Sequence, residues 1–173
     1  VGEAVWTRGM RNLAEALDPA AHVVHISSTG VYAEDQGGEV REESPLVEDS
    51  PLVAAEESLR GRRATVLRCS GLVDPDGPAT RMLQAFAGRT RPDGWLNLVR
   101  RDDVADVIAE AFSRSLTGTF NLSALTVRRS EYFDPRLSEA GLEPATWTVA
   151  ETGKRVVTEA FGGEFETRLR PLP

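Results

Sequence analysis

The alternation of helical patterns with short apolar runs constrains the fold of this chain more than any other feature of its sequence. Three runs rich in apolar and β-branched residues, at 22–27, 64–69 and 118–124, predict buried strands. Each run follows a segment in which apolar residues recur at helical spacing, namely residues 4–17, 52–60 and 102–113. Helix and strand in alternation predict an α/β fold, with a parallel sheet wrapped by helices.

The rest of the pattern is less regular. Val5, Met10, Leu13 and Leu17 form the apolar face of the first helix. Residues 33–51 are acidic and rich in Gly and Pro, which predicts a long surface loop. We also expect helices over 80–87 and 129–140, a strand over 95–99 and turns at 74–77 and 141–144, whereas the tail after them lacks a clear pattern.

Parallel sheets of this kind place ligands beyond the carboxyl ends of their strands, here expected at 27–32, 70–77 and 121–126. The hydroxyls of Ser27, Ser28 and Thr29 can hydrogen-bond a substrate there, or they can satisfy the backbone of their own turn. Two adjacent arginines, Arg100 and Arg101, can clamp a phosphate or carboxylate, or they can pair with neighbouring aspartates. The residues alone leave both alternatives open.

Other polar clusters favour structural roles. Asp102, Asp103 and Asp106 are expected to cap the start of a helix, where the helix dipole favours negative charge. His22 and His25 lie on a strand, and their three-residue spacing points them to opposite faces, which disfavours a metal pair. The sequence has no G-x-S-x-G elbow, no G-x-G-x-x-G turn and no Walker loop.

Composition excludes several classes of protein. The formal net charge of −7 disfavours a broad nucleic-acid surface, because phosphate binding needs a positive field. The single cysteine, Cys69, excludes an internal disulfide and a cysteine-built zinc site. No apolar run approaches the ~20 residues of a membrane span, and no leader pattern is visible, so we expect a cytoplasmic protein.

The order of several motifs resembles a known family. VWTRGMRNLAEAL is followed by HVVHISSTGVYAEDQGG and VREESP, then by ATVLRCSGLVDPDG, NLVRRDDVADVIAEAF and GTFNLSA. This order resembles the extended short-chain dehydrogenase/reductase superfamily, the NAD-dependent epimerase/dehydratases that act on nucleotide sugars. RRSEYF and GKRVVTEAFGGEFE look most like its atypical, YeeZ-like branch. The resemblance covers essentially the whole chain.

The resemblance implies a Rossmann-like sheet with a small α+β substrate lobe. It assigns 1–77 and 112–124 to the nucleotide-binding domain, and 78–111 and 125–173 to the lobe. Ser28 matches the family's catalytic serine, which binds and orients the reacting hydroxyl or carbonyl, and Ser27, Ser28 and Thr29 are expected to contact an NAD or NADP cofactor. No metal is expected, and the candidate substrate-binding residues are Tyr32, Leu72, Asp74, Gly77, Asn97, Arg100 and Arg101.

The first departure from the family concerns catalysis. In the family, a Tyr-x-x-x-Lys pair on the helix after this strand passes the proton and holds the nicotinamide ribose. The corresponding helix here reads SPLVAAEESL and has neither residue. Tyr132 and Arg136 have a similar spacing in another segment, and Lys154, the only lysine, lies in the C-terminal tail. A missing general acid/base forfeits roughly 10²–10⁴ in rate, so whether the protein is an enzyme stays open.

The second departure concerns the start of the chain. In the family, a glycine-rich turn and the first strands precede this segment and bind the cofactor's pyrophosphate. Residues 1–173 contain no such turn and begin with Val, so we expect a C-terminal portion that binds no dinucleotide by itself. The 22–27 strand would then expose an apolar edge, which we expect the missing N-terminal half, a second copy in a homodimer or a rearrangement to cover.

The resulting hypothesis is a portion of an NAD(P)-dependent epimerase/dehydratase-like protein, of oxidoreductase or isomerase type. Its substrate would be a nucleotide-sugar-like or other polar metabolite. The alternative is a catalytically inactive dinucleotide-binding sensor or scaffold with the same fold. Neither reading chooses between NAD and NADP or sets the oligomeric state.

Overall fold

The structure is a computed structural model that describes residues 2–74, 76–78 and 80–172, with side chains from Thr7 onward. The Val5 side chain, expected on the apolar face of the first helix, and Pro75, expected in the turn at 74–77, lie outside the described residues.

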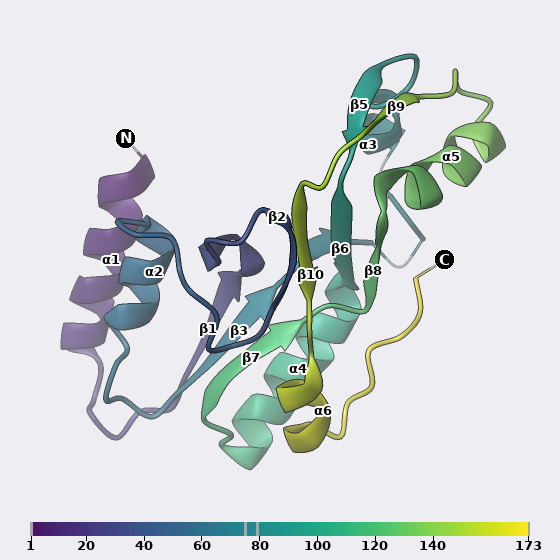
Figure 1. Cartoon of the computed structure of the whole chain (residues 1–173). Coiled ribbons are helices and arrows are strands. Elements are labelled where there is room, and N and C mark those ends of the chain that lie inside the picture. Colours follow the sequence, from purple (N-terminus) through teal and green to yellow (C-terminus); the bar gives the residue numbers. More distant parts are fainter. Residues whose placement is uncertain (1, 75, 79, 173) are drawn as a thin grey trace.

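A three-stranded parallel sheet forms the centre of the fold, in the order β1 (Val23–Ser28), β3 (Ala64–Cys69) and β7 (Gly118–Leu122) (Figure 1). Helix α2 (Pro51–Glu57) packs on one face, with α1 (Gly2–Ala16) beside it. Helix α4 (Arg101–Arg114) covers the other face. The α/β fold with a parallel sheet wrapped by helices is therefore confirmed, and each of its six main elements agrees with the predicted range to within a few residues.

Smaller sheets extend the structure beyond the carboxyl ends of these strands. One contains β4 (Gly71–Val73), β6 (Trp95–Arg100) and β8 (Leu125–Arg128), with β6 and β8 antiparallel. Two parallel pairs complete the set: β2 (Gln36–Val40) with β10 (Gly153–Val156), and β5 (Thr90–Asp93) with β9 (Thr146–Val149). The remaining helices are η1 (Thr29–Val31), α3 (Thr80–Gln84), α5 (Arg129–Glu139) and α6 (Glu159–Glu164).

The 33–51 segment and the C-terminal tail differ from the prediction. The segment expected to be a loop contains β2, and the tail contains β9, β10 and α6. Strand β2 pairs with β10, more than a hundred residues later, so no local pattern marks either strand. Gly37 in β2 has φ of 85° and lies against the tail, where a Cβ would approach Glu151 Oε2 to 2.9 Å.

Two apolar clusters hold the sheets together. The first joins Leu67 and Leu122 of the central sheet to Val104 and Val107 of α4 and to Phe165 of the tail. The second lies among the smaller sheets and contains Val73, Leu83, Leu98, Tyr132, Phe133 and Leu137. No described residue tests the proposed domain boundaries, which stay a prediction.

A buried polar network crosses the face of the central sheet that α2 covers. Arg68 of β3 is 5% exposed, and its Nη2 lies 2.7 Å from Glu56 Oε2 of α2. Glu56 also accepts a hydrogen bond of 2.5 Å from Ser27 Oγ of β1. Arg68 donates to Tyr32 Oη at 3.0 Å, and that hydroxyl donates to Asn121 Oδ1 of β7 at 2.6 Å. One arginine thus links all three strands to α2.

Carboxylates of α4, chiefly those of Glu110 and Asp103, hold the C-terminal segment against this helix. Glu110 accepts hydrogen bonds from the backbone amides of Glu166 and Thr167, at 2.7 and 2.8 Å, and from the Thr167 hydroxyl at 2.6 Å. Asp103, expected only to cap the helix, is 1% exposed and pairs with the Arg170 guanidinium. The aspartates at the start of α4 therefore anchor the tail.

Glu56→Gln should destabilise the protein by about 3–5 kcal/mol, because it leaves the Arg68 charge buried without a counter-ion. Equilibrium urea unfolding measures the change. The matched control is Arg60→Gln, which breaks the exposed pair with Glu57 and should cost less than about 1 kcal/mol. An equal loss of unfolding free energy in the two variants would contradict the claim that the buried pair contributes more to stability than the exposed one.

Acid should loosen the tail through Glu110. Burial alone would raise the pKa of this carboxyl, but hydrogen bonds from Thr167 and the Glu166 amide and contact with Arg114 outweigh burial and lower the pKa from 4.5 to about 2. The stabilisation is therefore fully present above about pH 4.5 and is lost as the pH falls toward 2. Urea midpoints measured between pH 5 and pH 2 should fall less steeply in Glu110→Gln than in the wild type, and parallel profiles would contradict this assignment.

Candidate functional site

The turn after β1 holds the three predicted cofactor-binding residues. Ser28 is the N-cap of η1, and its Oγ accepts the Gly30 amide at 3.1 Å. Ser27 is buried, with its hydroxyl committed to Glu56, so it acts within the network described above. Thr29 follows, and its carbonyl faces Lys154. Ser28 Oγ remains able to donate, because the turn uses it only as an acceptor.

Lys154 reaches this turn from the far end of the sequence. Its Nζ donates to Tyr32 O at 2.7 Å and lies 3.4 Å from Thr29 O. Burial lowers the pKa of this amine, and the nearby Asp35 and Glu34 oppose that shift. Lys154 lies far from the family's lysine in the sequence. The fold nevertheless places its charge beside the turn that follows the carboxyl end of β1. The pairing of β10 with β2 causes this approach, and no local sequence signal marks it.

The helix that follows the turn presents an apolar side chain to it. A Cβ on Gly30 would lie 3.3 Å from Ser28 Oγ and 3.9 Å from Leu52 Cδ1, so Leu52 of α2 lies beside Gly30 in this turn. Tyr132 and Arg136 lie elsewhere, on α5, where the guanidinium stacks 3.9 Å from the tyrosine ring centre. Burial raises the pKa of Tyr132, and Arg136 opposes that shift. Tyr132 belongs to the second apolar cluster, away from the turn that holds Ser28.

A cavity of about 230 Å³ brings three predicted substrate residues together. Leu72 and Asp74 enter it from the end of β4 and Arg101 from the first residue of α4, and Arg101 Nη1 lies 2.9 Å from Asp74 Oδ1. Arg81 and Met82 of α3, which no sequence motif singled out, line the same cavity. Their helical segment was predicted, but only tertiary packing places it over β4. The lining of the cavity thus includes two arginines, one aspartate and several apolar residues.

The other predicted substrate residues lie outside this cavity. Asn97 bridges β6 to β10, donating to Lys154 O at 2.7 Å and accepting from Val156 N at 3.0 Å. Tyr32 is 2% exposed within the buried network, and burial raises its pKa. Gly77 donates its amide to Asp74 O at 3.0 Å, which closes the turn beneath the cavity. Substrate-binding roles for these residues stay predictions.

Arg100 and Arg101, treated alike in the sequence, have different surroundings. Arg100 forms two hydrogen bonds of 3.1 Å with Asp102, which lower the pKa of that carboxyl. Arg101 is largely exposed, and the ion pair found for it among the described residues is the one with Asp74. Of the two, Arg101 is the better placed to bind an anion.

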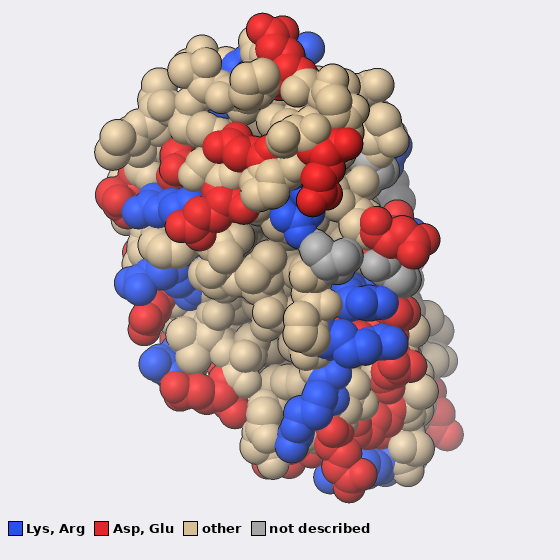
Figure 2. All heavy atoms as spheres, turned by 90° about the vertical axis from the view of Figure 1, so that its right-hand side faces the viewer, with Lys and Arg blue, Asp and Glu red and all other residues tan. Residues whose placement is uncertain are grey.

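The surface on this side of the molecule carries charges of both signs. Figure 2 shows basic side chains that form a band, with acidic side chains beside them. Near Arg101, the guanidinium of Arg170 pairs with Asp102 at 3.1 Å and with Asp106 at 3.2 Å. Recognition of an anion here would depend on local contacts rather than on a broad positive field.

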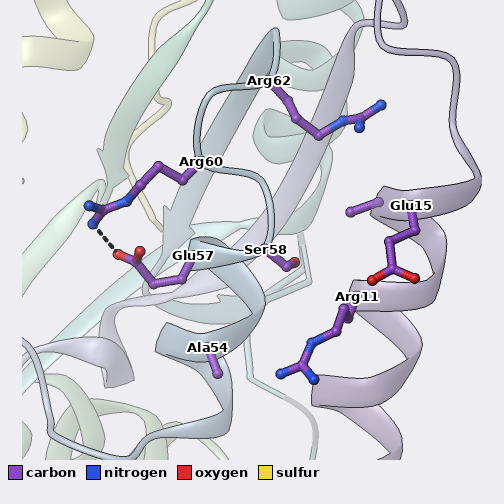
Figure 3. A pocket seen from close by; sticks show the side chains of 8 residues that line it. Arg11, Glu15, Ala54, Glu57, Ser58, Arg60 and Arg62 are labelled. Atoms are coloured by element: carbon purple, nitrogen blue, oxygen red, sulfur yellow. Dashed lines mark hydrogen bonds and ion pairs between the residues drawn. The ribbon is translucent and has the colours of Figure 1, made fainter.

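A larger cavity of about 620 Å³ lies between α1 and α2, away from the strand ends. Figure 3 shows Arg11 and Glu15 of α1 facing Ala54 of α2 and its C-cap residue Ser58 across it, with Arg60 paired to Glu57. None of its lining residues comes from 27–32, 70–77 or 121–126. Its mixed charges do not define a ligand class.

Two further properties bear on the kind of site. Among the described residues, no cluster of His, Cys, Asp and Glu could hold a metal ion. Within the same part of the chain, no helix is long and apolar enough to cross a membrane.

His22 has structural contacts, since its Nε2 lies 2.7 Å from Leu116 O and 3.0 Å from Thr65 Oγ1.

Comparison with solved structures identifies the fold. A hypothetical dTDP-4-dehydrorhamnose reductase from Sulfolobus tokodaii matches with a TM-score of 0.75 at 15% identity, over 99% of this chain and 68% of its own. RMD from Pseudomonas aeruginosa, complexed with NADPH, matches with a TM-score of 0.71 at 17% identity, over 97% of this chain and 68% of its own. UDP-glucuronic acid 4-epimerase from Bacillus cereus, in complex with NAD, matches with a TM-score of 0.69 at 16% identity, over 94% of this chain and 59% of its own.

The chain therefore has the fold of these epimerases and reductases, as the motif order predicted, and it spans about three fifths to two thirds of their length. No protein-family model and no curated protein matches the sequence.

Proposed function

We propose that this chain forms the substrate side of an NAD(P)-dependent epimerase/dehydratase-like protein of the extended short-chain dehydrogenase/reductase superfamily. The observation that carries the proposal is the cavity of about 230 Å³ at the end of β4, where Arg101, Arg81 and Asp74 converge beside Leu72 and Met82. Leu72 and Asp74 belong to the segment that follows the carboxyl end of β3 in the central parallel sheet. Sheets of that type bind ligands beyond the carboxyl ends of their strands.

The charges of the cavity favour a polar, anionic ligand. Guanidinium groups bind phosphate oxygens through paired, charge-assisted hydrogen bonds. Asp74 can accept hydrogen bonds from sugar hydroxyls, and the Leu72 and Met82 side chains offer an apolar wall to a ring. A nucleotide sugar has all three features, and solved structures of the same fold include an epimerase named for UDP-glucuronic acid and a protein in complex with UDP-glucose and NAD.

Ser28 is the residue of this chain proposed to act on the reacting group. Its Oγ lies at the turn after β1 and remains able to donate a hydrogen bond to a hydroxyl or carbonyl. NAD or NADP would supply the hydride chemistry when bound, and Ser27 and Thr29 frame the turn that it would approach. Residues 1–173 supply no glycine-rich turn for the pyrophosphate, so dinucleotide binding is proposed only for a protein with further polypeptide.

A second candidate function is a dinucleotide-binding sensor or scaffold without turnover. The observation that favours it is the helix α2, which places Leu52 beside Gly30 and has neither the tyrosine nor the lysine that this helix carries in the family. Without that pair, α2 lacks the groups that pass the proton and hold the nicotinamide ribose in the family. Turnover by a longer form of the protein that is lost in Ser28→Ala would exclude this alternative.

Binding of UDP-glucose tests the cavity. Arg101→Met should weaken its affinity for the 173-residue chain at least about tenfold, because a charge-assisted hydrogen bond contributes about 1.5–3 kcal/mol. Isothermal titration calorimetry measures the affinity. The matched control is Arg63→Met, which removes an exposed guanidinium just before β3 and should leave the affinity unchanged. Equal affinities for wild type and Arg101→Met would contradict the proposed anion contact.

A further inference from the structure

One peptide group connects the amine of Lys154 to the hydroxyl of Ser28. Lys154 Nζ donates a hydrogen bond of 2.7 Å to Tyr32 O, which holds the amine 3.4 Å from Thr29 O. The Thr29 carbonyl and the Gly30 amide are the two ends of a single planar peptide group. That amide donates to Ser28 Oγ at 3.1 Å. The amine and the serine oxygen therefore contact opposite ends of the same peptide group.

A positive charge at the carbonyl end of a peptide group changes the hydrogen bond at its amide end. The cation draws electron density toward the carbonyl oxygen, so the N–H becomes a stronger donor, and hydrogen bonds in series polarise one another. A hydroxyl oxygen that accepts a stronger hydrogen bond in turn donates its own proton more strongly. The proton of the Ser28 hydroxyl is available for this, because Oγ only accepts within the turn.

The fold fixes the amine at this place through the backbone of β10. Figure 1 shows β10 alongside β2, and the two strands pair in parallel. Asn97 Nδ2 of β6 also donates to Lys154 O at 2.7 Å. Among the described residues, the hydrogen-bond partners of the amine are the two carbonyls of the turn rather than a carboxylate. The charge of Lys154 therefore acts on these carbonyls without a directly paired anion.

The ionisable groups around the amine titrate in different pH ranges. Burial lowers the pKa of Lys154 from its usual 10.5, and the anions Asp35 and Glu34 oppose that shift. The Tyr32 ring centre lies 5.9 Å from Nζ, and burial raises the pKa of that phenol from its usual 10.0. Arg68, which lies 5.0 Å from the same ring centre, keeps its charge throughout. Burial thus moves the lysine titration to lower pH and the tyrosine titration to higher pH, which separates the two.

We infer that Lys154 is a positioning residue for Ser28: its ammonium group polarises the 29–30 peptide group and thereby strengthens the hydrogen bond that the serine hydroxyl donates to a bound carbonyl or hydroxyl. The lysine does not touch the ligand, and no covalent bond forms or breaks. The inference rests on the proposed function for the role of Ser28. The polarisation itself is a property of residues 1–173 and needs neither a ligand nor a dinucleotide.

Carbon-detected NMR of residues 1–173 tests the polarisation, because it does not depend on amide protons, which exchange rapidly at high pH. Lys154 is the only lysine, so its Cε resonance reports the protonation of Nζ without ambiguity. As the pH rises through this titration, the Thr29 carbonyl carbon and the Gly30 nitrogen should move upfield, and the Ser28 Cβ resonance should shift with them. All three should share the midpoint of the Lys154 Cε titration, which should lie below 10.5.

Two variants separate an effect of charge from an effect of shape. Lys154→Arg keeps a charge that does not titrate, so the Thr29 and Gly30 resonances should stay near their downfield positions over the same pH range. Lys154→Met removes the charge and should leave these resonances near their upfield positions at every pH. A side chain that only filled space at the turn would produce neither pattern.

The matched control is Arg155→Met on the same strand. Arg155 contacts Gly37 O and Glu39 rather than the turn, so its removal should leave the coupled titration unchanged. The inference is overturned if the turn resonances do not follow the Lys154 Cε titration in the wild type, or if they titrate equally in Lys154→Met. The wild-type titration decides the matter even where a variant does not fold.

Failure of this inference can be told apart from failure of the proposed function. Binding of UDP-glucose and its loss in Arg101→Met depend on the cavity beside β4, to which Lys154 does not contribute. A protein that binds UDP-glucose but lacks the coupled titration contradicts the role of Lys154 alone. The coupled titration, together with equal UDP-glucose affinities of wild type and Arg101→Met, would support the role of Lys154 and contradict the proposed anion contact.

Discussion

The buried ion pair between Arg68 and Glu56 is the interaction on which the rest of the structure depends. A charge taken from water is stable inside a protein only with a partner and further hydrogen bonds, and here Ser27, Tyr32 and the Glu42 carbonyl supply them. These partners come from β1, β3, α2 and the segment after η1. The requirement to satisfy one guanidinium therefore orders the strand end, the covering helix and the 29–42 segment together.

This network also explains why Tyr32 and Ser27 do not form an open site. Both belong to the motif that resembles a dehydrogenase, yet their hydroxyls serve the interior. The polar groups proposed to contact a ligand are therefore the Ser28 hydroxyl, in the turn after β1, and the side chains that line the cavity beside β4. Lys154 adds a positive charge on the carbonyls of the same turn. Buried hydrogen bonds thus hold the region at the carboxyl end of β1 in place, and they occupy most of its hydroxyl groups.

Sequence reasoning succeeded where periodicity is local and failed where pairing is distant. The helices α1 and α4 and the strands β1, β3, β6 and β7 have apolar patterns that a short window reveals. Strand β2 contains two glycines and β10 contains Lys154 and Arg155, so neither segment has the apolar pattern of a strand. Each is a strand because it pairs with the other. The candidate site divides the same way: Asp74 and Arg101 follow predicted elements, whereas Arg81 and Lys154 reach the region through tertiary packing.

The central claim is that these residues supply a substrate side and leave the dinucleotide to further polypeptide. A calorimetric titration of residues 1–173 with NAD, NADH, NADP and NADPH tests it most directly, with the protein extended by its upstream coding sequence as the comparison. The account predicts no binding heat for residues 1–173 and saturable binding of one dinucleotide pair by the longer protein. Tight binding of any of the four dinucleotides by residues 1–173 would contradict it.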